Sequence, residues 1–163
     1  MEKIENIKFA RKILEKLWAQ NKYDVMSKGY EQYVTLRNQY RELPELLIFD
    51  GLYDTFSTIM SKPYKRTGML TTLEHVWGYF KREATEEEKQ LFFEKLHFCK
   101  ALPDEFREFP KELLDILQLV ERLKDTYKKP YIQQSTLLTR GKWNEIMVKG
   151  RRYYFVDGEL YVQ

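Results

Sequence analysis

Apolar residues recur every three to four positions through the first 60 residues of the chain, which is the period of a helix with one buried face. This spacing predicts a first helix over residues 3–20 and a second, rich in tyrosine, over residues 23–40. Pro44 suits the first turn of a third helix. Pro63 ends that helix, because the residue before a proline is pushed out of the helical region.

The next helical pattern, over residues 69–82, has an apolar face and a polar face. The apolar residues are Met69, Leu73, Val76 and Phe80. The residues on the opposite side are Thr71, His75, Gly78 and Arg82. Glycine inside a helix costs about 1 kcal/mol relative to alanine, so we expect Gly78 to be there because something approaches the backbone closely. The polar face is therefore predicted to be the place of a functional site.

Two long helices and one short helix follow. Thr85 and Glu88 have the spacing of a capping box and predict a helix that starts there and continues through residue 98. Pro110 is expected to open a sixth helix, which ends near residues 128–130. Residues 131–139 are expected to form one more short helix.

The last 21 residues change to short runs rich in β-branched and aromatic side chains, over residues 143–148, 152–156 and 159–162. Asp157-Gly158 between two of these runs is typical of a two-residue hairpin. We therefore predict a mainly α protein, a single-domain bundle of six or seven helices with a small C-terminal antiparallel β-hairpin or three-stranded meander. The expected organisation is a helical part over residues 1–140, with the meander of residues 141–163 appended to the same domain. The final strand is expected at an exposed edge, where it can pair with a second copy, and either a monomer or a homodimer fits.

Composition narrows the class of protein. The chain has 163 residues, of which 15% are aromatic, as in a packed globular domain. It has no apolar stretch long enough to span a membrane and does not begin like a signal peptide. Cys99 is the only cysteine, which excludes an intrachain disulfide, so a reducing cytoplasm is the expected location.

Charge is distributed unevenly although the net charge is only +3. Residues 83–121 contain 11 acidic and 5 basic side chains, whereas residues 122–152 contain 9 basic and 2 acidic ones. Such asymmetry can attract a polyanion to one end of a molecule, although ordinary solvated helix ends give the same pattern.

The candidate chemistry gathers around His75. Phosphate groups would find cations at both ends of its helix, and an unpaired base could rest against His75 and Tyr79. The free amides of the helix N-terminus near residues 67–68 would add to anion binding. The predicted nucleic-acid-binding residues are Lys65, Arg66, Thr71, His75, Tyr79, Lys81 and Arg82, with Arg151 and Arg152 as supplementary phosphate contacts. The two histidines do not have metal-ligand spacing, so we expect neither a metal nor a cofactor.

Three segments carry a resemblance to a known family. They are residues 21–33, residues 66–89 with the run His75-Val76-Trp77-Gly78-Tyr79-Phe80, and residues 130–134. Together they resemble the YbgA-like domain family, a bacterial domain of uncharacterised function, over about residues 15–140. The resemblance implies that a nucleobase or an RNA is a neighbour of this domain, because members of that family often follow a desulfidase domain that acts on thiolated uracil. A single cysteine cannot hold the iron–sulfur cluster of such a desulfidase.

These observations lead to one main hypothesis and two alternatives. The main hypothesis is an accessory nucleic-acid-binding domain for tRNA or another thiolated RNA, connected with RNA or nucleobase sulfur metabolism. The first alternative is a small enzyme acting on a nucleotide or modified base, with His75 as the acid or base and Tyr79 in support. The second is a protein–protein adaptor that docks on a desulfidase partner.

Overall fold

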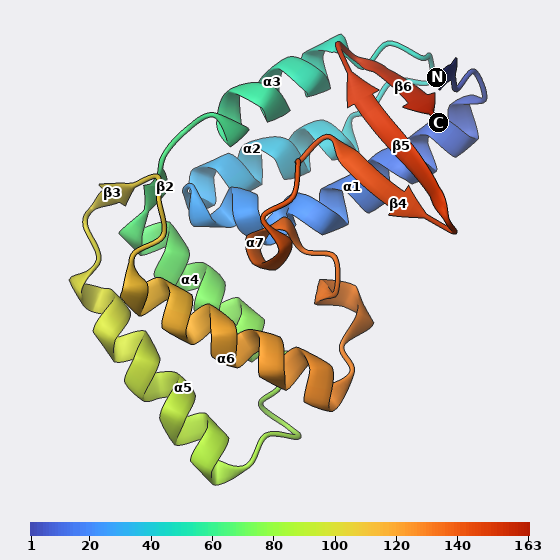
Figure 1. Cartoon of the computed structure of the whole chain (residues 1–163). Helices are drawn as coiled ribbons and strands as arrows, with labels where there is room; N and C mark the ends of the chain where they lie inside the picture. Colours follow the sequence, from blue (N-terminus) through green and yellow to red (C-terminus); the bar gives the residue numbers. More distant parts are fainter.

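The computed structural model describes residues 1–163 as seven α-helices and a small C-terminal antiparallel sheet, which confirms the predicted mainly α fold (Figure 1). The helices are α1 (Ile7–Ser27), α2 (Tyr30–Arg41), α3 (Asp50–Met60), α4 (Arg66–Trp77), α5 (Glu86–Phe98), α6 (Lys111–Tyr127) and α7 (Thr136–Thr139). The strands are β1 (Glu2–Lys3), β2 (Tyr64–Lys65), β3 (Glu105–Phe106), β4 (Glu145–Val148), β5 (Arg151–Val156) and β6 (Glu159–Val162). Short 3₁₀ turns cover Cys99–Ala101 (η1) and Pro130–Ile132 (η2). None of the helices has the length and apolar character that crossing a membrane requires.

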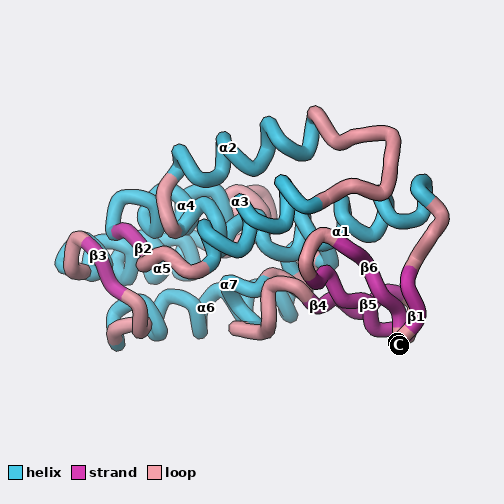
Figure 2. The backbone as a smooth tube through the Cα atoms, turned by 90° about the horizontal axis from the view of Figure 1, so that it is seen from above, coloured by secondary structure: helices cyan, strands magenta, loops and turns pink.

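Helix α1 connects the two halves of the hydrophobic core. Ile13 and Leu17 belong to a cluster of 16 buried residues that joins α1 to α2, α3 and the four-stranded sheet. Tyr23 and Met26, further along the same helix, belong to a cluster of 21 buried residues formed with α4, α5, α6 and α7. Seen from above, the four-stranded sheet lies at one end of the helices and the β2–β3 pair at the other (Figure 2).

The first helices differ in their limits from the prediction. Helix α1 continues to Ser27, and the break comes at Gly29, whose φ of 136° is left-handed and suits glycine. Helix α3 begins at Asp50 and not at Pro44. Residues 42–49 form a connection instead, in which the Pro44 carbonyl oxygen accepts a hydrogen bond from Arg11. The predicted end of α3 before Pro63 is confirmed.

The predicted strands and caps are confirmed in the second half of the chain. Thr85 and Glu88 form the reciprocal capping box of α5, with hydrogen bonds of 3.1 and 2.8 Å. Asp157 and Gly158, with φ of 51° and 84°, form the turn between β5 and β6. The apolar face of α4 is buried as expected.

The position of β6 corrects the expectation of an exposed final strand. The sheet order is β1-β6-β5-β4, so the two residues of β1 pair with β6 and cover its outer edge. The pairing brings the two ends of the chain side by side (Figure 1). Because β6 has a partner on both sides, it is not free to pair with a second copy.

Candidate functional site

Gly78 does not have the role that the sequence suggested. It is the C-cap of α4, with ordinary helical φ and ψ of −53° and −25°, and not an interior position. A methyl group there would lie 3.0 Å from the carbonyl oxygen of His75 in its own helix, and no neighbouring element approaches it. The glycine at a close approach is Gly68, which packs against the backbone at the end of α1.

The cations at the start of α4 are already paired with carboxylates. Lys65 Nζ lies 3.1 Å from Glu31 Oε1, and Arg66 Nη2 lies 2.7 Å from Asp104 Oδ1. The backbone N–H of Arg66 donates to the carbonyl oxygen of Asp104. The two cations expected to bind an anion at this helix N-terminus therefore each have a carboxylate beside them.

The other predicted residues of this surface are spread along α4. His75 is exposed and Thr71 half-buried, while Lys81 and Arg82 are exposed just beyond the C-terminus of α4. A helix of 12 residues is about 18 Å long, so Lys81 and Arg82 lie a full helix length from Lys65 and Arg66. The predicted binding residues of α4 therefore do not surround a single point on the surface.

Tyr79 lies in a group of aromatic rings. Its hydroxyl is 2.7 Å from the hydroxyl of Tyr23, and its ring stacks on Tyr131 with centroids 5.9 Å apart. Burial and the hydrogen bond with Tyr23 raise the pKa of Tyr79. Tyr79 thus supports Tyr131, whose ring is about half exposed.

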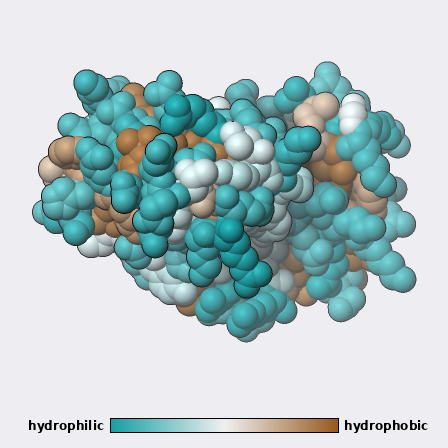
Figure 3. All heavy atoms as spheres, turned by 90° about the horizontal axis from the view of Figure 1, so that it is seen from below, coloured by the Kyte–Doolittle hydropathy of each residue, from teal (hydrophilic) through white to brown (hydrophobic).

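A groove runs along α1 on a different surface. It consists of three neighbouring cavities, which we call the inner, middle and outer cavities, of about 360, 330 and 460 Å³. The middle cavity shares Thr136, Gly141 and Lys142 with the inner one, and shares Gln20 and Gln134 with the outer one. Figure 3, seen from below, shows a face covered mainly by hydrophilic side chains, with smaller hydrophobic patches among them.

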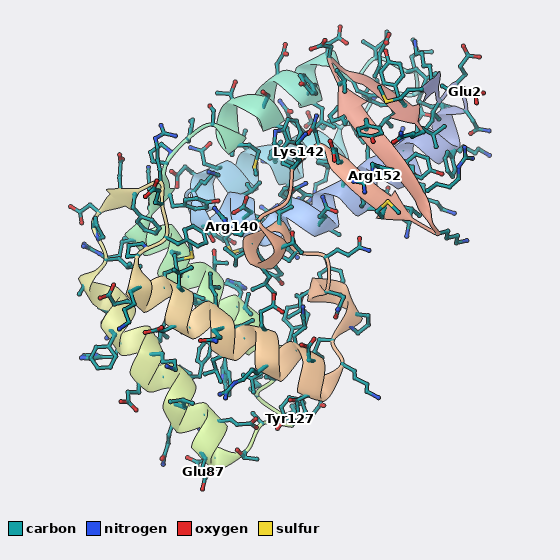
Figure 4. All side chains as sticks on the ribbon, viewed as in Figure 1. Glu2, Glu87, Tyr127, Arg140, Lys142 and Arg152 are labelled. Carbon is teal, nitrogen blue, oxygen red and sulfur yellow. The ribbon has the colours of Figure 1, made fainter.

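The charged side chains of this groove are mainly cationic, and we therefore call it the basic groove. Its two carboxylates are Asp24 and Glu145. Its six cations are Lys16, Lys28, Arg140, Lys142, Lys149 and Arg152. Four of these cations come from the connection between α7 and β4 and from the β-meander, where Arg140, Lys142 and Arg152 follow one another in Figure 4. The groove therefore includes Arg152, whereas Arg151 is exposed in β5 and does not line it.

Four polar residues meet at the inner cavity. Tyr64 donates its hydroxyl hydrogen to Asp24 Oδ1 at 2.7 Å, and Arg140 Nη1 donates to the Tyr64 hydroxyl at 2.9 Å. Arg140 Nη1 also lies 3.5 Å from Asp24 Oδ1. Lys28 Nζ sits 3.9 Å from the centre of the Tyr64 ring and donates to the Lys62 carbonyl oxygen. Asp24 and Lys28 are each only 5% exposed, so a carboxylate and an amine are buried together.

Helix α1 holds the far wall of the groove through side-chain hydrogen bonds. The Asn21 amide donates to the Trp143 carbonyl oxygen at 2.8 Å and accepts from the Thr136 hydroxyl at 2.8 Å. Gln20 donates to the Glu145 carbonyl oxygen at 2.9 Å. Residues 20, 21, 24 and 28 recur at helical spacing, so one face of α1 both fastens the wall and lines the groove.

Arg140 reaches the cavity from a left-handed backbone. It ends α7 with φ of 59°, which is uncommon for a residue with a side chain and is often found at functional sites. Its guanidinium carbon lies 3.8 Å from the centre of the Phe109 ring, which fixes the side chain.

Burial shifts the pKa values of this cluster. Burial raises the pKa of Asp24, while the hydrogen bond from Tyr64 and the charges of Lys28 and Arg140 lower it by less. Burial lowers the pKa of Lys28, which Asp24 partly offsets. Burial and the charge of Asp24 raise the pKa of Tyr64. Shifted groups at a cavity are characteristic of functional sites, although structural ion-pair networks show them too.

The shift of Asp24 predicts how stability depends on pH. Because its folded-state pKa lies above the ordinary value of 3.8, the folded protein binds the proton more tightly than the unfolded chain. Stability from this group is therefore full below that value and falls as pH rises through the folded-state pKa. We expect the free energy of unfolding of wild type, minus that of Asp24→Asn, to decrease as pH rises above about 4, as measured by urea denaturation. A difference that grows with pH would mean that Lys28 and Arg140 outweigh burial.

Other candidate chemistry is not supported by the geometry. Burial raises the pKa of the Cys99 thiol to about 11, so it stays protonated at neutral pH, as an inert structural cysteine does. No group of three or more histidine, cysteine, aspartate or glutamate side chains is placed to hold a metal ion.

Sequence reasoning did not single out Asp24, Lys28, Tyr64 or Arg140. The signal for the groove was the basic stretch of residues 122–152, which supplies Arg140, Lys142, Lys149 and Arg152. The polar positions of α1 gave no comparable signal, because a polar stripe on a helix normally faces water.

Comparison with known proteins gives one match. A family model described as a protein of unknown function (DUF1722) matches residues 22–140. That span contains the whole Asp24–Lys28–Tyr64–Arg140 cluster, and it ends before the β-meander. Neither the curated proteins nor the solved structures contain a significant match to this chain.

Proposed function

Because this chain belongs to the DUF1722 family, whose function is unknown, we propose a function from its own structure, the binding of single-stranded RNA along the basic groove. The observation on which this proposal rests is the charge of the groove, where six cations face two carboxylates. A groove of one sign raises the local concentration of a ligand of the opposite sign, and a nucleic-acid backbone carries one negative charge per phosphate.

The aromatic side chain at the outer cavity supports a single strand over a duplex. Tyr131 is 51% exposed and its ring is held in place by the stack on Tyr79. A cationic groove with an aromatic ring on which a base can stack is the usual arrangement in proteins that bind single strands. Bases in a duplex are already stacked and paired, so they are not free to use such a ring.

The groove is a better candidate than the α4 face. Lys65 and Arg66 at the start of α4 are each paired with a carboxylate, and so are Arg140, Lys142 and Arg152 in the groove. In the groove, Lys16 and Lys149 are exposed at the outer cavity. The amide of Gln134 lies between these cations and the inner cavity and can bind sugar or phosphate oxygens, whereas the Gln20 amide donates to the Glu145 carbonyl oxygen.

The double variant Lys16→Ala/Lys149→Ala tests the proposal. We expect it to bind every RNA sequence more weakly and to reduce the slope of log K against log salt concentration by about 1.4, since each phosphate contact with a single strand contributes about 0.7. The measurement is fluorescence anisotropy with labelled single-stranded RNA of about ten nucleotides, between about 50 and 200 mM salt.

Lys81→Ala/Arg82→Ala is the matched control, because it removes the same charge from the end of α4 and lies outside the groove. We expect wild-type affinity from this pair. If the control pair weakens binding and the groove pair does not, the RNA lies on the α4 face around His75. Binding that does not depend on salt would overturn both locations.

The finer parts of the proposal come from the resemblance to YbgA-like domains. They are that the RNA is a tRNA or another thiolated RNA, that a desulfidase is the partner protein, and that both work in the cytoplasm. The tRNA fraction that copurifies with the protein, analysed for thiolated nucleosides, tests the first of these. For catalysis by His75 the geometry gives no support, because the hydroxyl of Tyr79 is bonded to Tyr23.

A further inference from the structure

The inner cavity differs from the rest of the basic groove in having a buried carboxylate among its cations. Glu145 in the middle cavity is paired through both oxygens, with Lys142 at 3.6 Å and Arg152 at 3.3 Å. Asp24 uses only Oδ1, which accepts from Tyr64 and lies near Arg140. Asp24 Oδ2 has no hydrogen bond within the protein, yet Asp24 lines the cavity. A polyanion gains nothing from a buried negative charge, so Asp24 does not contribute to phosphate binding.

From this arrangement we propose that the inner cavity holds one unstacked cytosine of the bound RNA and that Asp24 Oδ2 accepts a hydrogen bond from its amino group. The inference rests on the proposed function, and it adds base preference to a groove that otherwise contacts phosphates. The cavity of about 360 Å³ is at the small end of the usual range for ligand pockets, about 300–1,000 Å³.

The choice of base follows from which groups in the cavity donate and which accept. In this proposal Asp24 is in its ionised form, which Tyr64, Lys28 and Arg140 favour although burial opposes it. That form only accepts hydrogen bonds, so the group opposite Oδ2 has to be a donor. Arg140 and Lys142 only donate, and both line the same cavity, whereas the third cation there, Lys28, already donates to the Lys62 carbonyl oxygen. The pairing edge of cytosine presents one amino donor followed by two acceptors, N3 and O2, which matches one carboxylate oxygen beside two cations. Carboxylates are known to accept from the amino group of cytosine.

The other bases fit this set of groups less well. Uracil presents an acceptor, O4, where cytosine presents the amine, and would place it against the carboxylate. Guanine presents two adjacent donors that need two free carboxylate oxygens, but Oδ1 is already bonded to Tyr64. Adenine has the amine but only one neighbouring acceptor, so it leaves one cation of the cavity without a partner.

Asp24 is held in place for this role. Tyr64, which orients Oδ1, is buried and packs its ring against Phe106 and Phe109. Arg140, which donates to the Tyr64 hydroxyl, is held in place by its contact with the Phe109 ring. A carboxylate fixed by two packed partners can discriminate between bases by position, because it cannot turn to suit a different edge.

The experiment compares single-stranded oligo(C) and oligo(U) of about ten nucleotides by fluorescence anisotropy. We expect wild-type protein to bind oligo(C) about tenfold more tightly than oligo(U). Asp24→Asn should lose this preference and keep the salt dependence of wild type, since the phosphate contacts are unchanged. Asp54→Asn, which neutralises an exposed carboxylate on α3, is the matched control and should keep the preference.

A second measurement leaves the protein unaltered and so does not depend on the variant folding. Oligo(C) in which the amino group carries two methyl groups has no hydrogen to donate and should bind no better than oligo(U). Salt-dependent binding with equal affinity for the three oligonucleotides would overturn the cytosine pocket and leave the groove in place. Absence of binding to all of them would overturn the proposed function, and this inference with it.

Discussion

Phe56→Ala is expected to lower the free energy of unfolding by about 3–5 kcal/mol, the range found when a buried phenylalanine is removed. Phe56 in α3 is fully buried. Its ring stacks on Trp143 with centroids 4.6 Å apart and meets the edge of Trp18 in α1 at 6.4 Å. One side chain thus joins α1, α3 and the wall of the basic groove.

Urea denaturation measures this effect, and the melting temperature should fall by about 2–4 °C for each kcal/mol lost. Phe98→Ala is the matched control, because Phe98 in α5 is 56% exposed. We expect that variant to change the free energy of unfolding by less than about 0.5 kcal/mol. Equal losses from the two variants would show that the packing around Trp143 is not a main source of stability.

Gly68→Ala is expected to lower the free energy of unfolding by about 1–3 kcal/mol, as overpacking does. A methyl group on Gly68 would lie 2.8 Å from the Met26 carbonyl oxygen, 2.9 Å from the Gly29 nitrogen and 3.0 Å from the Ser27 carbonyl oxygen. All three atoms belong to the backbone at the end of α1, so α1 and α4 would have to move apart. The sign is opposite to the usual effect of this substitution in a helix, which is stabilising.

Gly51→Ala provides the comparison in which helix propensity acts alone. Gly51 lies in α3, and nothing is within 4 Å of the position of its methyl group. We expect this variant to be more stable than wild type by up to about 1 kcal/mol. Chemical denaturation of both variants under the same conditions checks the pair, and a stabilised Gly68→Ala would show that α1 and α4 are not in tight contact.

Local signals in the sequence were sufficient where a structure depends on neighbouring residues. The capping box at Thr85 and the turn at Asp157-Gly158 both form as expected, because the atoms involved are within a few residues of each other. The buried stripe of α4 was also predictable, since it follows from the period of the helix. These are the features for which period and turn chemistry decide the result.

Of the candidate site, only its positive charge could be predicted from the sequence. The excess of basic residues after residue 121 indicated an anionic partner, and that stretch supplies four of the six groove cations. The sequence did not reveal that Asp24, Tyr64 and Arg140 meet, since each is separated from the next by at least 40 positions. The sequence also suggested a close approach to the backbone at Gly78, whereas the backbones of α1 and α4 come close together at Gly68.

The amino-acid order by itself determined the type of each long element and the limits of α5, α6 and the final hairpin, because hydrogen bonds within a helix or a hairpin and the burial of one face act over short distances. Only the packing of α1 against α4 and against residues 136–145 decided which polar side chains are buried together and which cations remain available. Those contacts join distant parts of the chain, and their energy depends on positions in space that no local pattern specifies.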